Sequence, residues 1–145
     1  LGDVYKRQAM WRTARVVRGI KLGTKQQVIS LMIPDEAGQV LVSSRNGYGK
    51  RSSFEDFPVI GRGGQGVIGM KISERNGAVV AATQVFEADE AIFISDQGTL
   101  VRIRAEDVSL QGRNTQGVRL INLSKKEYLV GMAQVQEPKQ EESEE

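Results

Sequence analysis

Few residues in this sequence could carry out chemistry. Histidine and cysteine are both absent, which removes the commonest general base, the imidazole and thiolate metal ligands, and every disulfide. Gly61, Gly63 and Gly66 fit the Gly-x-Gly-x-x-Gly spacing of dinucleotide sites. That signature needs a following helix, whereas residues 67–68 continue as a strand. We therefore expect no catalytic residue, no metal site and no nucleotide site.

Two carboxylate pairs remain as candidates for acid-base work. Glu55-Asp56 and Glu106-Asp107 lie 51 residues apart, at equivalent positions of a repeat. A pair that recurs once in every repeat is expected to shape a loop rather than to catalyse a reaction.

Arginines recur with the same regularity, and for them we expect a binding role. Arg62 is equivalent to Arg113, and Arg51 to Arg102. Arg102 and Arg104 alternate with apolar residues, which places both guanidinium groups on one face of a strand. Such cations bind the phosphates of duplex DNA by releasing counterions, without reading bases. The predicted DNA-binding residues are Arg51, Arg62, Arg102, Arg104, Arg113 and Arg119, whereas Arg75 lies outside the aligned motifs.

These arginines belong to an internal repeat of about 51 residues, a period typical of propellers and arrays. Residues 44–47 align with 95–98, and residues 65–67 with 116–118. A third, incomplete copy lies upstream, where Trp11 and Val16 stand in the places of motif glycines. The chain thus holds about two and a half copies.

Each copy reads as a set of short strands joined by glycine turns. Segments rich in Val, Ile, Leu and Phe predict strands at residues 28–33, 39–43, 78–82, 91–95, 100–104, 118–121 and 128–133. The predicted turn glycines are Gly47, Gly61, Gly66, Gly98, Gly112 and Gly117. No segment shows helical periodicity. We predict an all-β fold of antiparallel four-stranded blades, as in a β-pinwheel or propeller, whose repeats stack face to face.

Charge divides the chain into a basic body and an acidic end. Residues 136–145 hold five glutamates and one lysine, which leaves 19 basic against 13 acidic residues in the rest. We predict three segments: residues 1–9, which match no repeat, the blades of residues 10–135, and this acidic end. We expect the acidic end to be disordered and to compete with DNA for the basic residues. No apolar run is long enough to span a membrane, and the absence of cysteine fits a cytoplasmic protein.

Three motifs resemble the blades of a known family. Residues 46–51 (Asn-Gly-Tyr-Gly-Lys-Arg), 61–67 (Gly-Arg-Gly-Gly-Gln-Gly-Val) and 112–120 (Gly-Arg-Asn-Thr-Gln-Gly-Val-Arg-Leu) closely resemble motifs in the C-terminal β-pinwheel domain of DNA gyrase A subunits. The resemblance covers roughly residues 10–135. The related A subunits of topoisomerase IV have more degenerate motifs.

The resemblance implies a function. The family's domain is a β-pinwheel of six blades that wraps duplex DNA around a basic rim, within an ATP-dependent type II topoisomerase that introduces negative supercoils. This chain would be a non-catalytic part of it, in the bacterial cytoplasm and associated with the nucleoid. ATP, magnesium, the gyrase B subunit and a second A subunit would bind other regions. The alternative is a β-propeller used for protein interaction, with incidental basic residues.

The sequence departs from the family pattern in two places. The family's basic box, Gln-Arg-Arg-Gly-Gly-Lys-Gly, has no full match here, and residues 60–66 are the nearest, as expected of a later blade. Trp11 and Val16 replace glycines of the first motif. If those glycines have positive φ, we expect the first turn to be strained.

Overall fold

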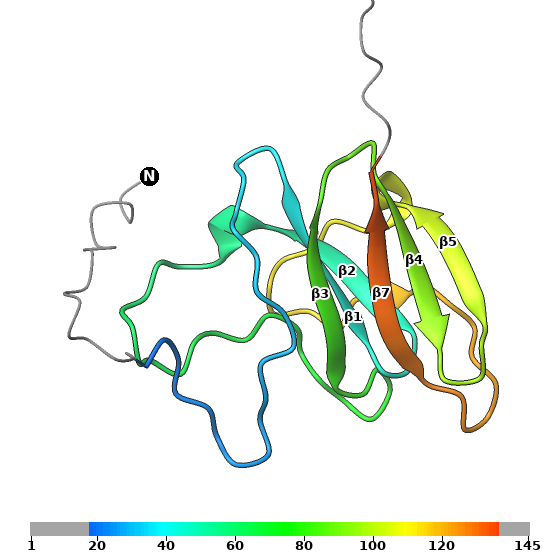
Figure 1. The fold of residues 1–145 in the computed structure, drawn as a ribbon, viewed down its shortest axis with the longest axis horizontal. Helices are drawn as coiled ribbons and strands as arrows, with labels where there is room; N and C mark the ends of the chain where they lie inside the picture. Colours follow the sequence, from blue (N-terminus) through cyan, green and yellow to red (C-terminus); the bar gives the residue numbers. More distant parts are fainter. Residues whose placement is uncertain (1–17, 137–145) are drawn as a thin grey trace, which may run out of the picture.

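The computed structural model describes residues 18–136, which form two antiparallel sheets (Figure 1). The strands are β1 (Gln39–Ser44), β2 (Tyr48–Ser53), β3 (Val79–Val85), β4 (Glu90–Ser95), β5 (Leu100–Arg104), β6 (Val118–Arg119) and β7 (Leu129–Val135). Short 3-10 turns, η2 (Phe54–Asp56) and η3 (Ala105–Asp107), follow β2 and β5. Within the described residues no helix is long and apolar enough to cross a membrane. The predictions for residues 1–9, Trp11, Val16 and the acidic end beyond residue 136 lie outside this range.

The prediction of an all-β, antiparallel fold is confirmed. Sheet A has the strand order β3-β1-β2-β6, and sheet B has the order β5-β4-β7. The hairpin β1–β2 of the first repeat corresponds to the hairpin β4–β5 of the second. Strands β3 and β7 close the two repeats in the same way, each pairing with the first strand of its hairpin.

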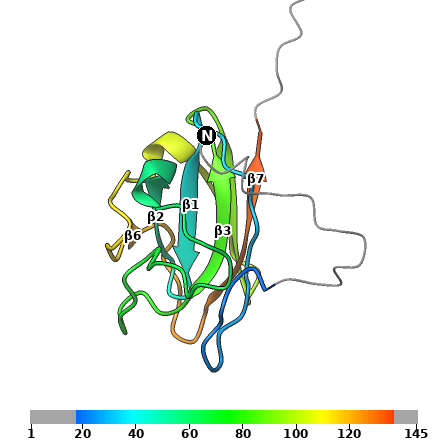
Figure 2. The same ribbon diagram turned by 90° about the vertical axis from the view of Figure 1, so that its left-hand side faces the viewer.

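The two repeats are joined by an exchanged strand. β6 belongs to the second repeat by sequence, yet it pairs with β2 of the first, with Tyr48 opposite Arg119 and Gly49 opposite Val118. Figure 2 shows β6 and the loop before it on the outer side of β2. Sheet A therefore has four strands, whereas sheet B has three in the described part of the chain.

The main hydrophobic core lies between the sheets. Leu41 and Val85 from sheet A contact Phe93 and Leu129 from sheet B, and all four side chains are buried. Alternation along the strands selects them, because every second residue points to the same face. On the opposite face of sheet A, Val40 and Val42 belong to a second, smaller cluster with Tyr48 and Met70.

The strand predictions were wrong at three places, the first being residues 67–68, which form no strand. Residues 28–33 form no strand and are mostly exposed, although they are rich in Val and Ile. β2 was not predicted, because Gly49, Lys50 and its serines lack the apolar pattern of a strand. Hydrogen bonds to β1 and to the second repeat, rather than apolar side chains, satisfy the buried polar groups of β2.

The turn glycines fall into two groups. Gly47, Gly66, Gly98 and Gly117 have φ between 75° and 85°, which L residues rarely adopt. Gly61 and Gly112 lie in their predicted loops without positive φ, and a Cβ atom there would meet nothing within 4 Å. The backbone requirement for glycine thus applies at the repeat position of Val16 and not at that of Trp11.

Candidate nucleic-acid interface

The loop that carries Arg113 lies on sheet A, although it belongs to the second repeat. The Ser52 hydroxyl donates to the carbonyl of Gln111 at 2.8 Å. The backbone N–H of Lys71 donates to the carbonyl of Thr115 at 2.9 Å. The first repeat therefore fixes the position of this loop.

A buried lysine holds the same loop from beneath. Lys50 is fully buried, and its Nζ donates to the carbonyl of Gly112 at 2.6 Å and to that of Arg113. Burial lowers the pKa of Lys50 to about 8, and attraction to Asp56 opposes that effect. The side chain is therefore mostly charged at neutral pH, so that it binds both carbonyls as an ammonium group.

Arg113 itself turns toward the first repeat. Its Nε donates to the carbonyl of Asp56 at 3.1 Å, and its Nη1 donates to the carbonyl of Ile68 at 2.6 Å. The side chain is half-buried. A guanidinium group has five N–H donors, so these two bonds leave donors for an external anion.

Arg51 does not have the exposure expected of a DNA contact. It is 8% exposed, and its guanidinium group donates to the carbonyls of Val108 and Glu106 and to the side-chain oxygen of Gln39. We correct its predicted role: Arg51 ties the second repeat to sheet A. Its repeat equivalent, Arg102, is exposed, because no segment of the described residues covers it as residues 106–111 cover Arg51.

Arg102 and Arg104 lie on one face of β5, as predicted from their alternation. Both are more than half exposed and ion-paired: Arg102 with Glu90, and Arg104 with Glu106 at 2.7 Å and Asp107 at 3.0 Å. Hydrogen bonding to Asp107 raises the pKa of Arg104 further. Exposed pairs of this kind are worth about 0–1 kcal/mol, so a phosphate could compete for these arginines.

The two remaining predicted residues are exposed and have no ion pair within the described range. Arg62 is in the loop between Gly61 and Gly66. Arg119 is on β6, where its Nη2 donates to the Tyr48 hydroxyl at 2.8 Å. The structure does not bring all six predicted arginines together on one surface patch.

Sequence reasoning missed two further arginines that stack on tyrosines. The guanidinium carbon of Arg45 lies 3.9 Å from the ring centroid of Tyr128, and that of Arg75 lies 4.8 Å from that of Tyr48. Arg75 is therefore not a neutral reference position, because it shares Tyr48 with Arg119. Arg75 lies in a turn whose side-chain hydrogen bond recurs with the period of the repeat, and this recurrence is the feature by which Arg75 can be recognised.

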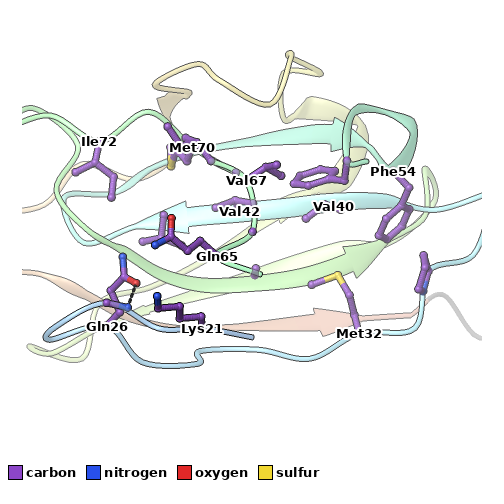
Figure 3. Close-up of a pocket in the computed structure, with 18 residues that line it drawn as sticks. Lys21, Gln26, Met32, Val40, Val42, Phe54, Gln65, Val67, Met70 and Ile72 are labelled. Carbon is purple, nitrogen blue, oxygen red and sulfur yellow. Dashed lines mark hydrogen bonds between the residues drawn. The ribbon is translucent and has the colours of Figure 1, made fainter. Parts of the chain in front are cut away.

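An apolar groove lies on the face of sheet A that points away from sheet B (Figure 3). It has a volume of about 830 Å³, and its lining includes Val40, Val42, Phe54 and Met70. Val40 and Val42 occupy the repeat positions of Ala91 and Phe93, of which Phe93 packs against sheet A. By this equivalence the groove has the character of a face between two blades rather than that of a ligand site.

The described carboxylates do not gather into a cluster of metal ligands. In the described part of the chain, no group of three or more His, Cys, Asp or Glu residues could hold a metal ion. The repeated pairs Glu55-Asp56 and Glu106-Asp107 both lie in the 3-10 turns, η2 and η3. Their position matches the predicted role of shaping a loop.

The fold and the distribution of basic residues define a class: a repeat protein built of antiparallel blades that exchange a strand and expose cations. Comparison with known families assigns the chain more closely. The model of the family described as "DNA gyrase C-terminal domain, beta-propeller" matches residues 38–85 and 89–136. The chain belongs to this family.

Similar proteins and structures agree with this assignment. The chain is 58% identical over 129 residues to the DNA gyrase A subunit of Pseudomonas aeruginosa, covering 89% of the chain and 14% of that protein. It is 46% identical over 135 residues to the DNA gyrase A subunit of Escherichia coli (strain K12), covering 93% of the chain and 15% of that protein. The chain thus spans about one seventh of the length of these relatives.

Two solved structures have a similar fold. A structure of a DNA gyrase A C-terminal domain matches with a TM-score of 0.64 and 32% identity, over 66% of this chain and 33% of that one. The C-terminal domain of a DNA topoisomerase IV matches with a TM-score of 0.76 over 82% of this chain and 38% of that one. At 16% identity, this second likeness shows the fold alone.

Proposed function

We propose that this chain is a non-catalytic module that binds and wraps duplex DNA, within the A subunit of a DNA gyrase. The observation that carries the proposal is the family match over both repeats. The relatives are named as DNA gyrase A subunits, and that name supports a supercoiling type II topoisomerase as the parent enzyme. Its ATP, magnesium, B subunit and second A subunit would bind outside this chain, in the bacterial cytoplasm at the nucleoid.

The exposed cations support binding to DNA in particular. Arg62 and Arg119 are exposed and lack a carboxylate partner in the described residues, whereas Arg102 and Arg104 have only weak exposed pairs. Cations in such places gain affinity by displacing counterions from phosphates, so binding would not depend on base sequence. The cost of bending the duplex would be offset by additional phosphate contacts.

Two measurements test the proposal. Binding of the chain to duplexes of unrelated sequence should weaken with salt between about 50 and 200 mM, with similar affinity for each sequence. Ligation of a nicked circle in the presence of the chain should then shift the topoisomer distribution if DNA is wrapped. Binding that is insensitive to salt, or absent, would favour the rival class, a propeller that binds other proteins, for which the apolar groove on sheet A offers a surface.

A further inference from the structure

Three turns with the same hydrogen bond recur through the described residues. In each, the backbone N–H of one residue donates to the side-chain oxygen of the residue three positions later. The pairs are Gly23 to Gln26 at 2.6 Å, Ser73 to Asn76 at 2.7 Å and Ser124 to Glu127 at 3.0 Å. Successive turns are 50 and 51 residues apart, the period of the repeat. The side-chain hydrogen bond is therefore repeated in three copies. In the first and third turns the N–H of the acceptor residue also closes the backbone, whereas in the second the N–H of Gly77, one residue later, donates to the carbonyl of Ser73.

The residue before each side-chain acceptor is a cation. Lys25, Arg75 and Lys126 occupy this position, and all three are exposed. Lys25 and Lys126 share a left-handed backbone conformation, with φ of 64° and 63°. In Figure 1 the three turns, coloured blue, green and orange, lie along the lower edge of the molecule in sequence order. The fold thus places one cation per repeat along one edge.

The second and third of these cations meet in one pocket. Arg75 and Lys126 line a cavity of about 330 Å³ together with Arg119 and Tyr48. The guanidinium carbons of Arg75 and Arg119 lie 4.8 Å and 5.4 Å from the centroid of the Tyr48 ring. Both arginines lower the pKa of the Tyr48 hydroxyl, Arg75 more strongly. Two cations from different repeats are therefore held against one aromatic ring.

The charge of this pocket is not neutralised. Arg75, Arg119 and Lys126 have no ion pair within the described residues, in contrast to Arg102 and Arg104 on β5. The single carboxylate in the lining, Glu127, is buried. Its oxygens accept hydrogen bonds from Ser95, Thr99 and the backbone of Ser124. The pocket retains an excess of positive charge and N–H donors for an anion.

We propose that Arg75, Arg119 and Lys126 form a phosphate-binding pocket that holds the backbone of duplex DNA, and that Lys25 extends the same row to the preceding repeat. This inference rests on the proposed function. Phosphate is the matching anion because guanidinium groups bind it through several parallel N–H donors. DNA, a polymer with regularly spaced phosphates, fits a row of cations that repeats along one edge. A free phosphate would need only one position of that row.

The test compares salt dependence among matched variants of the whole chain. Arg75→Gln and Lys126→Gln should each lower the slope of log affinity against log salt by about 0.9, the value for one phosphate contact. Lys125→Gln removes a neighbouring exposed cation that does not line the pocket, and it should change the slope by less than half of that. Tyr48→Phe, which removes the hydroxyl that accepts from Arg119 but keeps the aromatic ring beside both arginines, should weaken binding less than Arg75→Gln does. Urea melts of each variant confirm that it is folded.

The outcomes separate the two proposals. If the unaltered chain binds duplex DNA but Arg75→Gln and Lys126→Gln behave like Lys125→Gln, the pocket is wrong and the DNA-binding function stands. If the unaltered chain does not bind DNA at all, both are overturned. If inorganic phosphate binds the unaltered chain and DNA does not, the pocket is a site for free anions and the inference about DNA fails.

Discussion

Substitution of Gly117 by alanine is expected to disrupt the strand exchange that joins the two repeats. Gly117 has φ of 75°, and the left-handed conformation costs an L residue about 1–2 kcal/mol. An added Cβ would lie 2.6 Å from the carbonyl oxygen of Gly49 and 2.9 Å from its carbon. These atoms belong to the backbone of β2, which cannot move without breaking its pairing, so the overlap adds about 1–3 kcal/mol. We expect a total loss of about 2–5 kcal/mol.

Urea unfolding followed by circular dichroism measures this loss. With a slope of about 2 kcal/mol per molar urea, the midpoint should fall by about 1–2.5 M. Gly112→Ala is the matched control from the same loop, because its φ is not positive and a Cβ there meets nothing within 4 Å. This variant should leave the free energy of unfolding unchanged or raise it by up to about 1 kcal/mol. Equal midpoints for the two variants would refute the reasoning from backbone conformation and contact.

Two further predictions concern stability. The hydroxyls of Ser95 and Thr99 lower the pKa of Glu127 from 4.5 to about 2, so the stabilisation that it provides is complete above pH 4.5 and is lost as pH falls toward 2. Urea midpoints measured from pH 6 down to 2 should therefore fall in the unaltered chain, and they should fall less in Glu127→Gln. An equal fall in both proteins would count against this assignment. Arg51→Gln should lower the free energy of unfolding by about 2–4 kcal/mol, since its buried guanidinium group binds three oxygens, while the salt slope of DNA binding by the folded protein stays the same. A reduced slope would restore Arg51 to the DNA-binding residues.

The sequence predicted the repeat architecture well where local physics decides the conformation. The turns at Gly47 and Gly98 follow from the need for positive φ, and β4 and β5 follow from their apolar alternation. β2 could not be predicted in this way. Its polar side chains are buried because the loop before β6 in the next repeat covers them, and the bonds of Lys50 and Ser52 to that loop are not visible in local sequence.

The candidate site was predicted less well, for a related reason. Because Arg51 and Arg102 are equivalent in the repeat, both were predicted to bind DNA, but different segments surround the two positions in the structure. The cation before the turn acceptor was missed because Gln26, Asn76 and Glu127 are different residue types. Their common property is a side-chain oxygen that accepts the same backbone N–H bond, and only the coordinates reveal it.

The exchanged strand β6 also sets an order on biosynthesis. A ribosome completes β2 at Ser53 but reaches Arg119 only 66 residues later, which takes about 3–13 s at about 5–20 residues per second. Throughout that interval the outer edge of the nascent hairpin has unpaired backbone groups, which other strands can join. The first of these two blades is thus finished by the second, and its outer edge stays open until β6 has been made.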